Sequence, residues 1–486
     1  MNQKQLKQKA ISGVLWKGLE RVCAQVVSTV VSIVLARMLI PEDYSVVSIT
    51  AIFFSFCNIF ISGGLNSALI QKKDADELDF ATILSVNMLM AVVLYAVMFI
   101  AAPFLAELYN KPILIHAVRV MALSFFINAY KAVVSAKVNS DLQFKKFFWS
   151  TFIGTVISAV IGIWMAFKGY GPWALIAQQM ANSFIDAIVL TFTVHFRARF
   201  MFSIKRFKRL LAFGGRIFIA SIITVIYDQT KPLIVGLKFS ATDLAFYNKG
   251  QSFPNLITSI ASNTLSSSLF PVMAKAQDQK EVILAMTRRY MRISSFLVFP
   301  LMMGFAAISE NFVKIVLTDK WLPIVPYIVI FCASSALMPI QDGNLQAIRA
   351  IGRSDIILKL ELIKKASFFV VILLFVFLTN SPILLAVSGI ITNILASLFN
   401  TQPNMKLIGY QYRLQIMDLL PNFVTAILMG VTVFFMNYLP INMYLLVVLQ
   451  IVSGVLFYCG INIVIRNESF YYILDMVKGI LHGKAK

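Results

Sequence analysis

The chain has 486 residues, of which 59% are hydrophobic and only 13% are charged. An average soluble protein is about 45–50% apolar and about 25% charged, so this composition excludes a soluble globular enzyme and indicates a membrane protein. Lys and Arg number 43 against 22 Asp and Glu, which gives a formal net charge of +21. We expect no nucleic-acid partner, because these basic residues lie in short segments between apolar stretches, where membrane topology explains them.

Apolar stretches long enough to cross a bilayer run through almost the whole chain. A transmembrane helix needs about 20 mainly apolar residues for a hydrocarbon core of about 30 Å. Fourteen stretches, called spans 1 to 14 below, fit this template: 14–39, 44–69, 81–105, 113–134, 147–167, 172–196, 210–236, 247–273, 291–309, 323–347, 361–379, 382–402, 416–438 and 443–465. The sequence therefore predicts an all-α polytopic membrane protein with about 14 transmembrane helices.

The basic residues of the loops predict the orientation. If the N-terminus is inside, cytoplasmic segments hold 30 of the 43 Lys and Arg, and outward segments hold seven. Cytoplasmic loops are enriched in Lys and Arg, so we expect both termini to be cytoplasmic. The outward segments are all short, which leaves no room for an extracytoplasmic catalytic domain and disfavours a polymerase or ligase.

Weak internal similarity predicts two related lobes. Residues 34–49 resemble 234–250, with Asp43 matching Asp243, and residues 171–183 resemble 381–393. Transporters are often built from two such bundles. We expect an N-lobe of spans 1–6 (1–200), a C-lobe of spans 7–12 (201–405), and spans 13 and 14 with a cytoplasmic tail appended (406–486). Six spans per lobe give both lobes the same orientation, with a pseudo-twofold axis along the membrane normal.

Ionisable residues inside spans mark the candidate site, because such residues are costly in a bilayer and usually face a bundle interior or a watery cavity. One stripe of span 1 carries Lys17 and Arg21, followed by polar residues at helical spacing. Span 7 repeats the pattern with Arg216, Asp228 and Lys231. Spans 2 and 8 add Ser and Asn stripes, so the sequence predicts a cavity lined by spans 1, 2, 7 and 8.

Each of these residues also has a structural alternative. Lys17 can reach the membrane surface by snorkelling, and Glu20 can partner Arg21. Arg216 can anchor to lipid phosphates near its span end. Asp228 and Lys231 can neutralise each other as a buried pair at i, i+3.

Three further spans carry candidates. Arg119 and Lys131 lie twelve residues apart on one predicted face of span 4. Asp186 of span 6 is the best first-lobe carboxylate for a coupling proton or cation, with a structural pairing to Arg119 as the alternative. In span 10, Gln341, Asp342 and Gln346 are the corresponding candidates in the second lobe, with interhelical hydrogen bonding as the alternative.

No pattern indicates a cofactor or metal. The four Cys and three His residues are widely separated, without the spacing of a zinc site or disulfide framework, and no phosphate-binding GxxxxGK[ST] loop occurs. We expect no enzyme activity. A cavity richer in Arg and Lys than in carboxylates favours an anion, and guanidinium groups suit phosphate.

Several segments together resemble the polysaccharide transport proteins, the Wzx-type oligosaccharide flippases of the multidrug/oligosaccharidyl-lipid/polysaccharide exporter superfamily. They are GVLWKGLERV (13–22), LARMLIPEDYSVVSI (35–49), GGLNSALIQ (63–71), GYGPWALIAQQ (169–179), YDQTKPLIVGLKFSATDLAFYNKG (227–250) and LFPVMAKAQ (269–277). Ser45 stands where the family commonly has Gly.

The resemblance implies a two-lobed flippase of the bacterial inner membrane. It would move an undecaprenyl-diphosphate-linked oligosaccharide to the periplasmic face by alternating access, for O-antigen, capsule or exopolysaccharide assembly. Its partners would be that substrate, membrane lipids and polysaccharide polymerase machinery. Arg21, Arg216 and Lys231 become candidate contacts to the diphosphate or to anionic sugars, with Lys17 and Arg119 after them, and Asp186 and Asp228 become candidates for ion coupling.

Four other functions remain open. A non-transporting membrane scaffold would leave the intramembrane charges unexplained, unless they form structural pairs. A drug or metabolite exporter of the same superfamily predicts a more acidic cavity than these stripes give. A flippase for lipid-linked peptidoglycan precursors shares the same physics. A membrane glycan polymerase or glycosyltransferase would need catalytic carboxylates or a sizeable outward loop.

Overall fold

The computed structural model describes residues 3–72, 74–141, 143–194 and 200–481, without the side chains of 3–15, 17, 19, 21, 22, 261–271, 476, 477 and 479–481. These residues form helices and connecting turns, and no β-strand occurs among them. They pack into two compact units, unit 1 (Met1–Ala245) and unit 2 (Phe246–Lys486). Each unit is described by itself.

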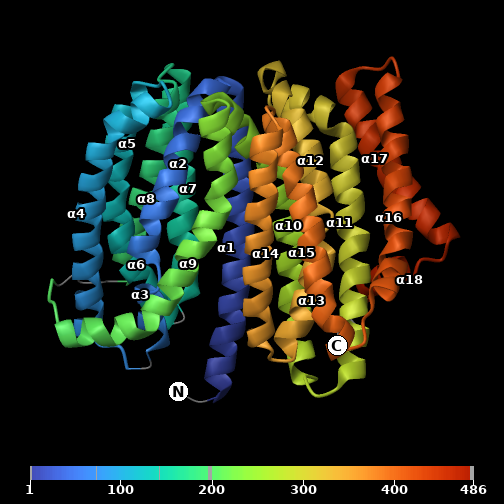
Figure 1. Cartoon of the computed structure of the whole chain (residues 1–486), viewed down its shortest axis with the longest axis horizontal. Coiled ribbons are helices and arrows are strands. Elements are labelled where there is room, and N and C mark those ends of the chain that lie inside the picture. The colour runs from blue at the N-terminus through green and yellow to red at the C-terminus, as the bar shows by residue number, and fades with distance from the viewer. Residues whose placement is uncertain (1–2, 73, 142, 195–199, 482–486) are drawn as a thin grey trace. The chain divides into compact units, whose positions relative to one another are not determined.

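Unit 1 is a bundle of long helices with two short ones (Figure 1). Its helices are α1 (Gln3–Met38), α2 (Pro41–Ser62), α3 (Leu65–Gln71), α4 (Glu77–Leu108), α5 (Ile113–Ala122), α6 (Ser124–Ser140), α7 (Phe144–Phe167), α8 (Pro172–Val194) and α9 (Ile204–Lys238). The next helix, α10 (Ala241–Lys275), begins in unit 1 and continues in unit 2.

Unit 2 contains the rest of α10 and a second bundle. Its helices are α11 (Lys280–Val316), the 3₁₀ turn η1 (Asp319–Ile324), α12 (Val325–Ser335), α13 (Met338–Ala350), α14 (Ser354–Leu378), α15 (Pro382–Leu407), α16 (Tyr412–Phe435), η2 (Met436–Tyr438), α17 (Met443–Val464) and α18 (Glu468–Leu481). The chain thus ends its described part in a short helix after the last predicted span.

The helices confirm the predicted all-α membrane fold. Within the described residues, 11 helical segments are long and apolar enough to cross a membrane. Spans 1, 8 and 11 are not among them, although each coincides with a helix, namely α1, α10 and α14. In α1 the side chains are described without gaps only from Cys23, and Cys23–Met38 is a shorter apolar helix. The count of 14 membrane crossings and the lobe symmetry therefore stay predictions.

The lobe boundaries from the sequence repeat also stay predictions. Packing places α9 in unit 1, whereas the repeat assigned residues 201–405 to a second lobe. The two repeated turns do share a local structure. The backbone N–H of Ile40 donates to Asp43 before α2, and the Ser240 hydroxyl donates to Asp243 before α10, so an Asp stabilises both helix starts.

A double glycine breaks span 2 into α2 and α3. Gly64 has φ +78°, a conformation that favours glycine. Here α9 crosses closely, because a Cβ on Gly214 of α9 would lie 2.8 Å from the carbonyl carbon of Gly64. Any side chain at either position would push the two helices apart.

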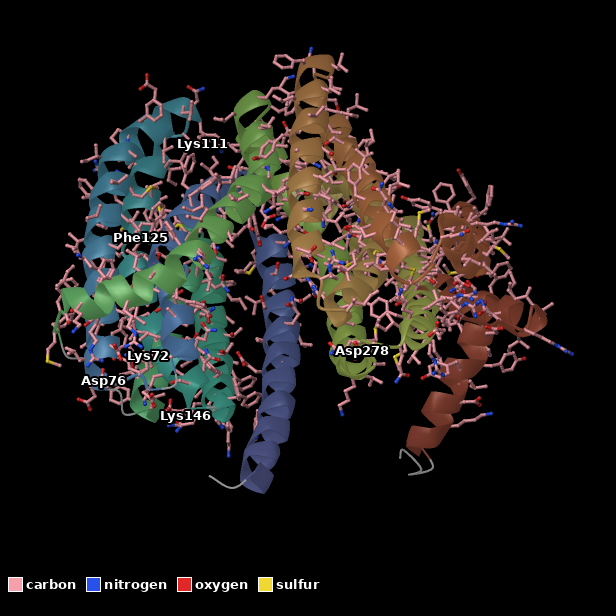
Figure 2. The ribbon with its side chains drawn as sticks, turned by 60° about the horizontal axis from the view of Figure 1, so that its bottom comes forward. Lys72, Asp76, Lys111, Phe125, Lys146 and Asp278 are labelled. Carbon is pink, nitrogen blue, oxygen red and sulfur yellow. The ribbon has the colours of Figure 1, made fainter. Side chains whose placement is uncertain are left out.

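Basic loops alternate between the two ends of unit 1. Figure 2 shows Lys72 and Lys146 at one end of the unit and Lys111 at the opposite end. The sequence assigned Lys72 and Lys146 to cytoplasmic segments and Lys111 to an outward one, so the alternation is confirmed here. Which end faces the cytoplasm stays a prediction.

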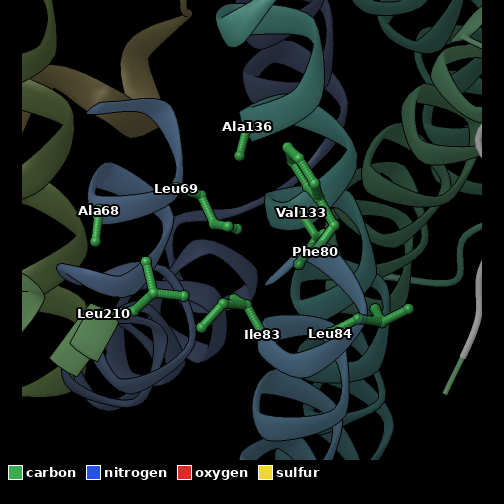
Figure 3. Close-up of a cluster of buried hydrophobic side chains, with 8 residues drawn as sticks. All are labelled: Ala68, Leu69, Phe80, Ile83, Leu84, Val133, Ala136 and Leu210. Carbon is green, nitrogen blue, oxygen red and sulfur yellow. The ribbon is translucent and has the colours of Figure 1, made fainter. Parts of the chain in front are cut away.

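An apolar core joins four helices near the Lys72 end of unit 1. Figure 3 shows its eight buried residues, Ala68, Leu69, Phe80, Ile83, Leu84, Val133, Ala136 and Leu210. They come from α3, α4, α6 and the first turns of α9. Burial of these apolar side chains therefore fixes the start of α9 on the α3–α4 turn.

Candidate functional site

An ion pair lies between two helices of unit 1, at positions that the sequence marked. The Nζ of Lys131 in α6 pairs with the Oδ2 of Asp186 in α8. The Asp186 side chain is 9% exposed and that of Lys131 is 32% exposed. Asp186 Oδ1 is buried and has no hydrogen-bond partner among the described residues. The carboxylate therefore has one buried oxygen whose hydrogen-bonding capacity is unused among the described residues.

Close packing of α7 holds this carboxylate in place. A Cβ on Gly154 of α7 would lie 3.2 Å from the Cβ of Asp186, and one on Gly162 would lie 2.7 Å from the Cβ of Gln178. The polar stripe predicted for span 6 therefore faces α7 at two glycines, where the backbones approach closely.

The structural alternative, in which Asp186 pairs with Arg119, is wrong, because Asp186 pairs with Lys131. The Arg119 guanidinium instead lies over the Phe99 ring, 4.0 Å from its centre, and its Nε has no hydrogen-bond partner among the described residues. Span 4 is divided into α5 and α6 at Leu123. The prediction of one shared face for Arg119 and Lys131 assumed a single unbroken helix.

The candidates on α9 differ in burial. Arg216 and Asp228 are exposed, whereas Lys231 is 8% exposed. The alternative in which Asp228 and Lys231 form a buried pair is therefore wrong in its burial, because only Lys231 is buried. The apolar window of α9 is 11% buried, the smallest share among the candidate spans of the described chain. Few residues of this helix are buried, and the rest are half-buried or exposed.

The side chains of Lys17 and Arg21 lie outside the described residues. Their helix, α1, packs on α7: Trp16 lies 5.4 Å from Phe148 between ring centres, and the Thr151 hydroxyl donates to Glu20 at 3.2 Å. The cavity predicted from spans 1, 2, 7 and 8 combines helices of both units and stays a prediction.

Hydrogen bonds between helices explain one candidate of span 10. The Gln341 side-chain amide donates to the Asn393 carbonyl of α15 at 3.2 Å, which confirms the interhelical alternative for this residue. Nearby, Asn344 donates to Thr401 at 3.1 Å and to Gln415 at 3.0 Å. Sequence reasoning missed this network, although polar residues recur on α15 at helical spacing.

A second missed group gathers at one end of unit 2. Arg288 of α11 donates to Asp418 of α16 through Nε at 2.7 Å and Nη2 at 2.8 Å. Arg292 donates to the same carboxylate at 2.9 and 2.6 Å and pairs with Glu468 of α18. The Tyr410 hydroxyl donates to Asp418 at 2.8 Å. Burial, with the Asp418 charge, raises the pKa of Tyr410, so the phenol keeps the proton it donates.

A cavity of about 410 Å³ opens beside these arginines. In the sequence, Arg288 and Arg292 entered only the count of cytoplasmic loop charges. No neighbouring residue indicated that Asp418, which follows them by 130 and 126 residues, would be their partner. The usable signals were the i, i+4 spacing of the two arginines and a lone Asp inside span 13.

Comparisons with known proteins agree with the fold. Residues 34–326, more than half of the chain, match a family described as "Polysaccharide biosynthesis protein". The lipopolysaccharide biosynthesis protein WzxC of Escherichia coli (strain K12) is 22% identical over 74% of this chain and 73% of its own length. The succinoglycan biosynthesis transport protein ExoT of Rhizobium meliloti (strain 1021) is 20% identical over 68% and 67%.

Among solved structures, the lipid II flippase MurJ in an inward closed conformation aligns with a TM-score of 0.73 and 14% identity. The alignment covers 94% of this chain and 99% of MurJ. The expected resemblance is thus confirmed in family and in fold.

Proposed function

Because the chain belongs to the family of polysaccharide biosynthesis proteins, we propose that it is a flippase for undecaprenyl-diphosphate-linked oligosaccharide repeat units. It moves them across a bacterial inner membrane by alternating access, for O-antigen, capsule or exopolysaccharide assembly, and no covalent bond of the substrate changes. The observation that carries the proposal is the family match on a chain whose fold aligns with MurJ over 94% of its length.

Phosphate recognition falls to the cationic residues of α1, α5 and α9. Arg216 has the strongest support of these, because it is exposed on α9, the helix with the least buried apolar window. A guanidinium can bind a diphosphate through paired hydrogen bonds. Arg21 and Lys231 serve the same anion, with Lys17 and Arg119 as further contacts.

Asp186 is the proposed coupling residue, with Asp228 as its alternative. The Lys131 ammonium neutralises Asp186, and the second carboxylate oxygen has no partner among the described residues. A proton or Na⁺ that binds Asp186 weakens its pair with Lys131 and thereby changes the contact between α6 and α8. This gives an ion gradient a route to the conformational change.

Both termini are placed in the cytoplasm, on the basis of the loop charges. The partners are the lipid-linked substrate, surrounding membrane lipids and polysaccharide polymerase machinery. Cysteine accessibility at single engineered positions, in a variant without the four native cysteines, tests the orientation.

Transport is tested with the purified protein in liposomes that contain a fluorescent undecaprenyl-diphosphate oligosaccharide. We expect wild-type protein to move it between leaflets and Arg216→Ala to lower the rate about tenfold or more, as the loss of a charged hydrogen-bonding group predicts. Arg209→Ala is the matched control, because Arg209 is an exposed arginine at the start of the same helix.

Asp186→Asn and Asp228→Asn are measured under imposed Na⁺, H⁺ and potential gradients. Loss of the response to one gradient in Asp186→Asn, with Asp228→Asn unchanged, supports the coupling assignment. Absence of wild-type movement under every gradient and with several glycans would instead favour a small-molecule exporter.

A further inference from the structure

The cavity at the end of unit 2 has the features of a built anion site. Helices α11 and α18 are in contact beside it, and Figure 1 shows α18 near the end of unit 2 that holds the first turns of α16. The cavity measures about 410 Å³, within the roughly 300–1,000 Å³ of ordinary ligand pockets. Its lining includes Arg288, Arg289, Arg292, Glu468 and Tyr472.

Two of its three arginines are fixed in advance. Arg288 and Arg292 both donate to Asp418, whose side chain is 1% exposed. A buried carboxylate shared by two guanidinium groups holds them in one geometry before any ligand arrives. Such preorganisation lowers the entropy that ligand binding must otherwise cost.

The third arginine has its donors available. The Arg289 guanidinium stacks on Tyr472, 3.8 Å from the ring centre, and forms no ion pair or hydrogen bond within the described part of the chain. Stacking fixes its plane and leaves its N–H groups at the edge, in the cavity wall. Three guanidinium groups face two carboxylates here, so the site keeps an excess of positive charge.

One of those carboxylates is poorly placed to neutralise the site. The side chain of Glu468 is 80% exposed and reaches only Arg292, whereas Asp418 is buried. An incoming anion can therefore replace Glu468 at Arg292 without disturbing the Asp418 contacts. Glu468 acts as an internal competitor for the ligand.

The position of α18 indicates which anions reach the cavity. The helix follows the apolar span of α17 after the turn at Arg466 and Asn467. Its sequence, ESFYYILDMVKGIL, mixes aromatic and aliphatic residues with charged ones. Such helices lie in the interface between lipid headgroups and acyl chains. With α18 in that interface, the cavity between α11 and α18 opens at the depth of the lipid phosphates.

We propose that this cavity binds the phosphate group of an anionic membrane lipid, held by Arg289 together with Arg288 and Arg292, and that Glu468 competes for the same guanidinium groups. The site is separate from the proposed transport residues, and its occupancy does not depend on transport. Bound lipid fastens α18 to α11 at the membrane surface.

The full-length protein in detergent is titrated with phosphatidylglycerol, and bound lipid is counted by native mass spectrometry. Phosphatidylcholine is the zwitterionic control, and inorganic phosphate is added as a soluble competitor. We expect phosphatidylglycerol to bind more tightly than phosphatidylcholine and Arg289→Gln to weaken its binding about tenfold, the size expected for one charge-assisted contact. Arg413→Gln, an exposed arginine on α16, is the matched control and should bind as wild type does.

We expect Glu468→Gln to change lipid affinity in the opposite direction from Arg289→Gln. Removal of the competing carboxylate should tighten lipid binding severalfold, a gain that misfolding cannot produce. Equal binding by wild type and Arg289→Gln, or weaker binding by Glu468→Gln, would overturn the proposal. Displacement of lipid by millimolar inorganic phosphate would identify a soluble phosphate as the ligand and overturn the lipid assignment.

Discussion

Each unit contains a network of charged side chains at a helix end, and the two networks differ in the number of cationic groups relative to carboxylates. In unit 1, Arg206 at the start of α9 pairs with Asp76 at 2.8 Å and with Asp79 at 3.1 Å, and Lys72 also pairs with Asp79. Two cations thus meet two carboxylates. In unit 2, the arginines of α11 outnumber Asp418 and Glu468.

The difference shows that the same residue types can have a structural role in one network and a ligand-binding role in another. The unit 1 network surrounds a fully buried carboxylate, Asp79, and lies beside the apolar core of Figure 3, so it fastens α9 to the α3–α4 turn. The unit 2 network fastens α11 to α16 in a similar way, but an unbalanced arginine remains beside a cavity. Balance indicates a structural role, and imbalance beside a cavity indicates a ligand.

The largest expected effect is that of Asp418→Asn. Asp418 accepts hydrogen bonds from Arg288, Arg292 and Tyr410, and its loss leaves two arginines without their shared partner. We expect destabilisation of about 4 kcal/mol, within the range for breaking a buried ion pair. Thermal unfolding in detergent, followed by tryptophan fluorescence, measures it. A melting temperature equal to wild type would show that the network does not hold α11 to α16.

Lys131→Met is expected to cost about 3 kcal/mol, because it leaves the buried Asp186 carboxylate without its cation. The double variant Lys131→Met/Asp186→Leu removes both charges and should recover part of that loss. A double-mutant cycle on melting temperatures gives the coupling. Purely additive losses would contradict a direct interaction.

Asp79→Asn should destabilise the protein by about 2 kcal/mol, the value for weakening hydrogen bonds to a charged group. Lys72 and Arg206 are nearer the surface and can regain water. Anionic lipid binding should stay at the wild-type level, since this network lies in unit 1. Loss of lipid binding in Asp79→Asn would break the distinction between the two networks.

The smallest expected effect on stability is that of Asp355→Asn. The Arg353 guanidinium donates to the exposed Asp355 carboxylate and lowers its pKa to about 2. A lowered pKa means that any stabilisation is present above about pH 4 and is lost as pH falls towards 2. Exposed pairs contribute little, so we expect no measurable change in melting temperature at pH 7. A clear drop would show that surface pairs also fix this fold.

The sequence by itself determined three properties: the membrane environment of the chain, its helical secondary structure and its family. Apolar runs of about 20 residues can satisfy their backbone groups in a bilayer only as helices, and every predicted span coincides with one or more helices. Quoted motifs such as residues 227–250 pointed to the family that the comparison then matched. These properties depend on local composition and spacing, which a single sequence contains.

Only the tertiary structure decided which side chains meet. Asp186 pairs with Lys131 and not with Arg119, and Asp418 meets arginines that precede it by 126 and 130 residues. Helical periodicity defines the faces of each helix, but helix breaks such as the one between α5 and α6 shift those faces. The partner of a charged residue is set by the packing of distant helices, and that packing is a property of the whole fold.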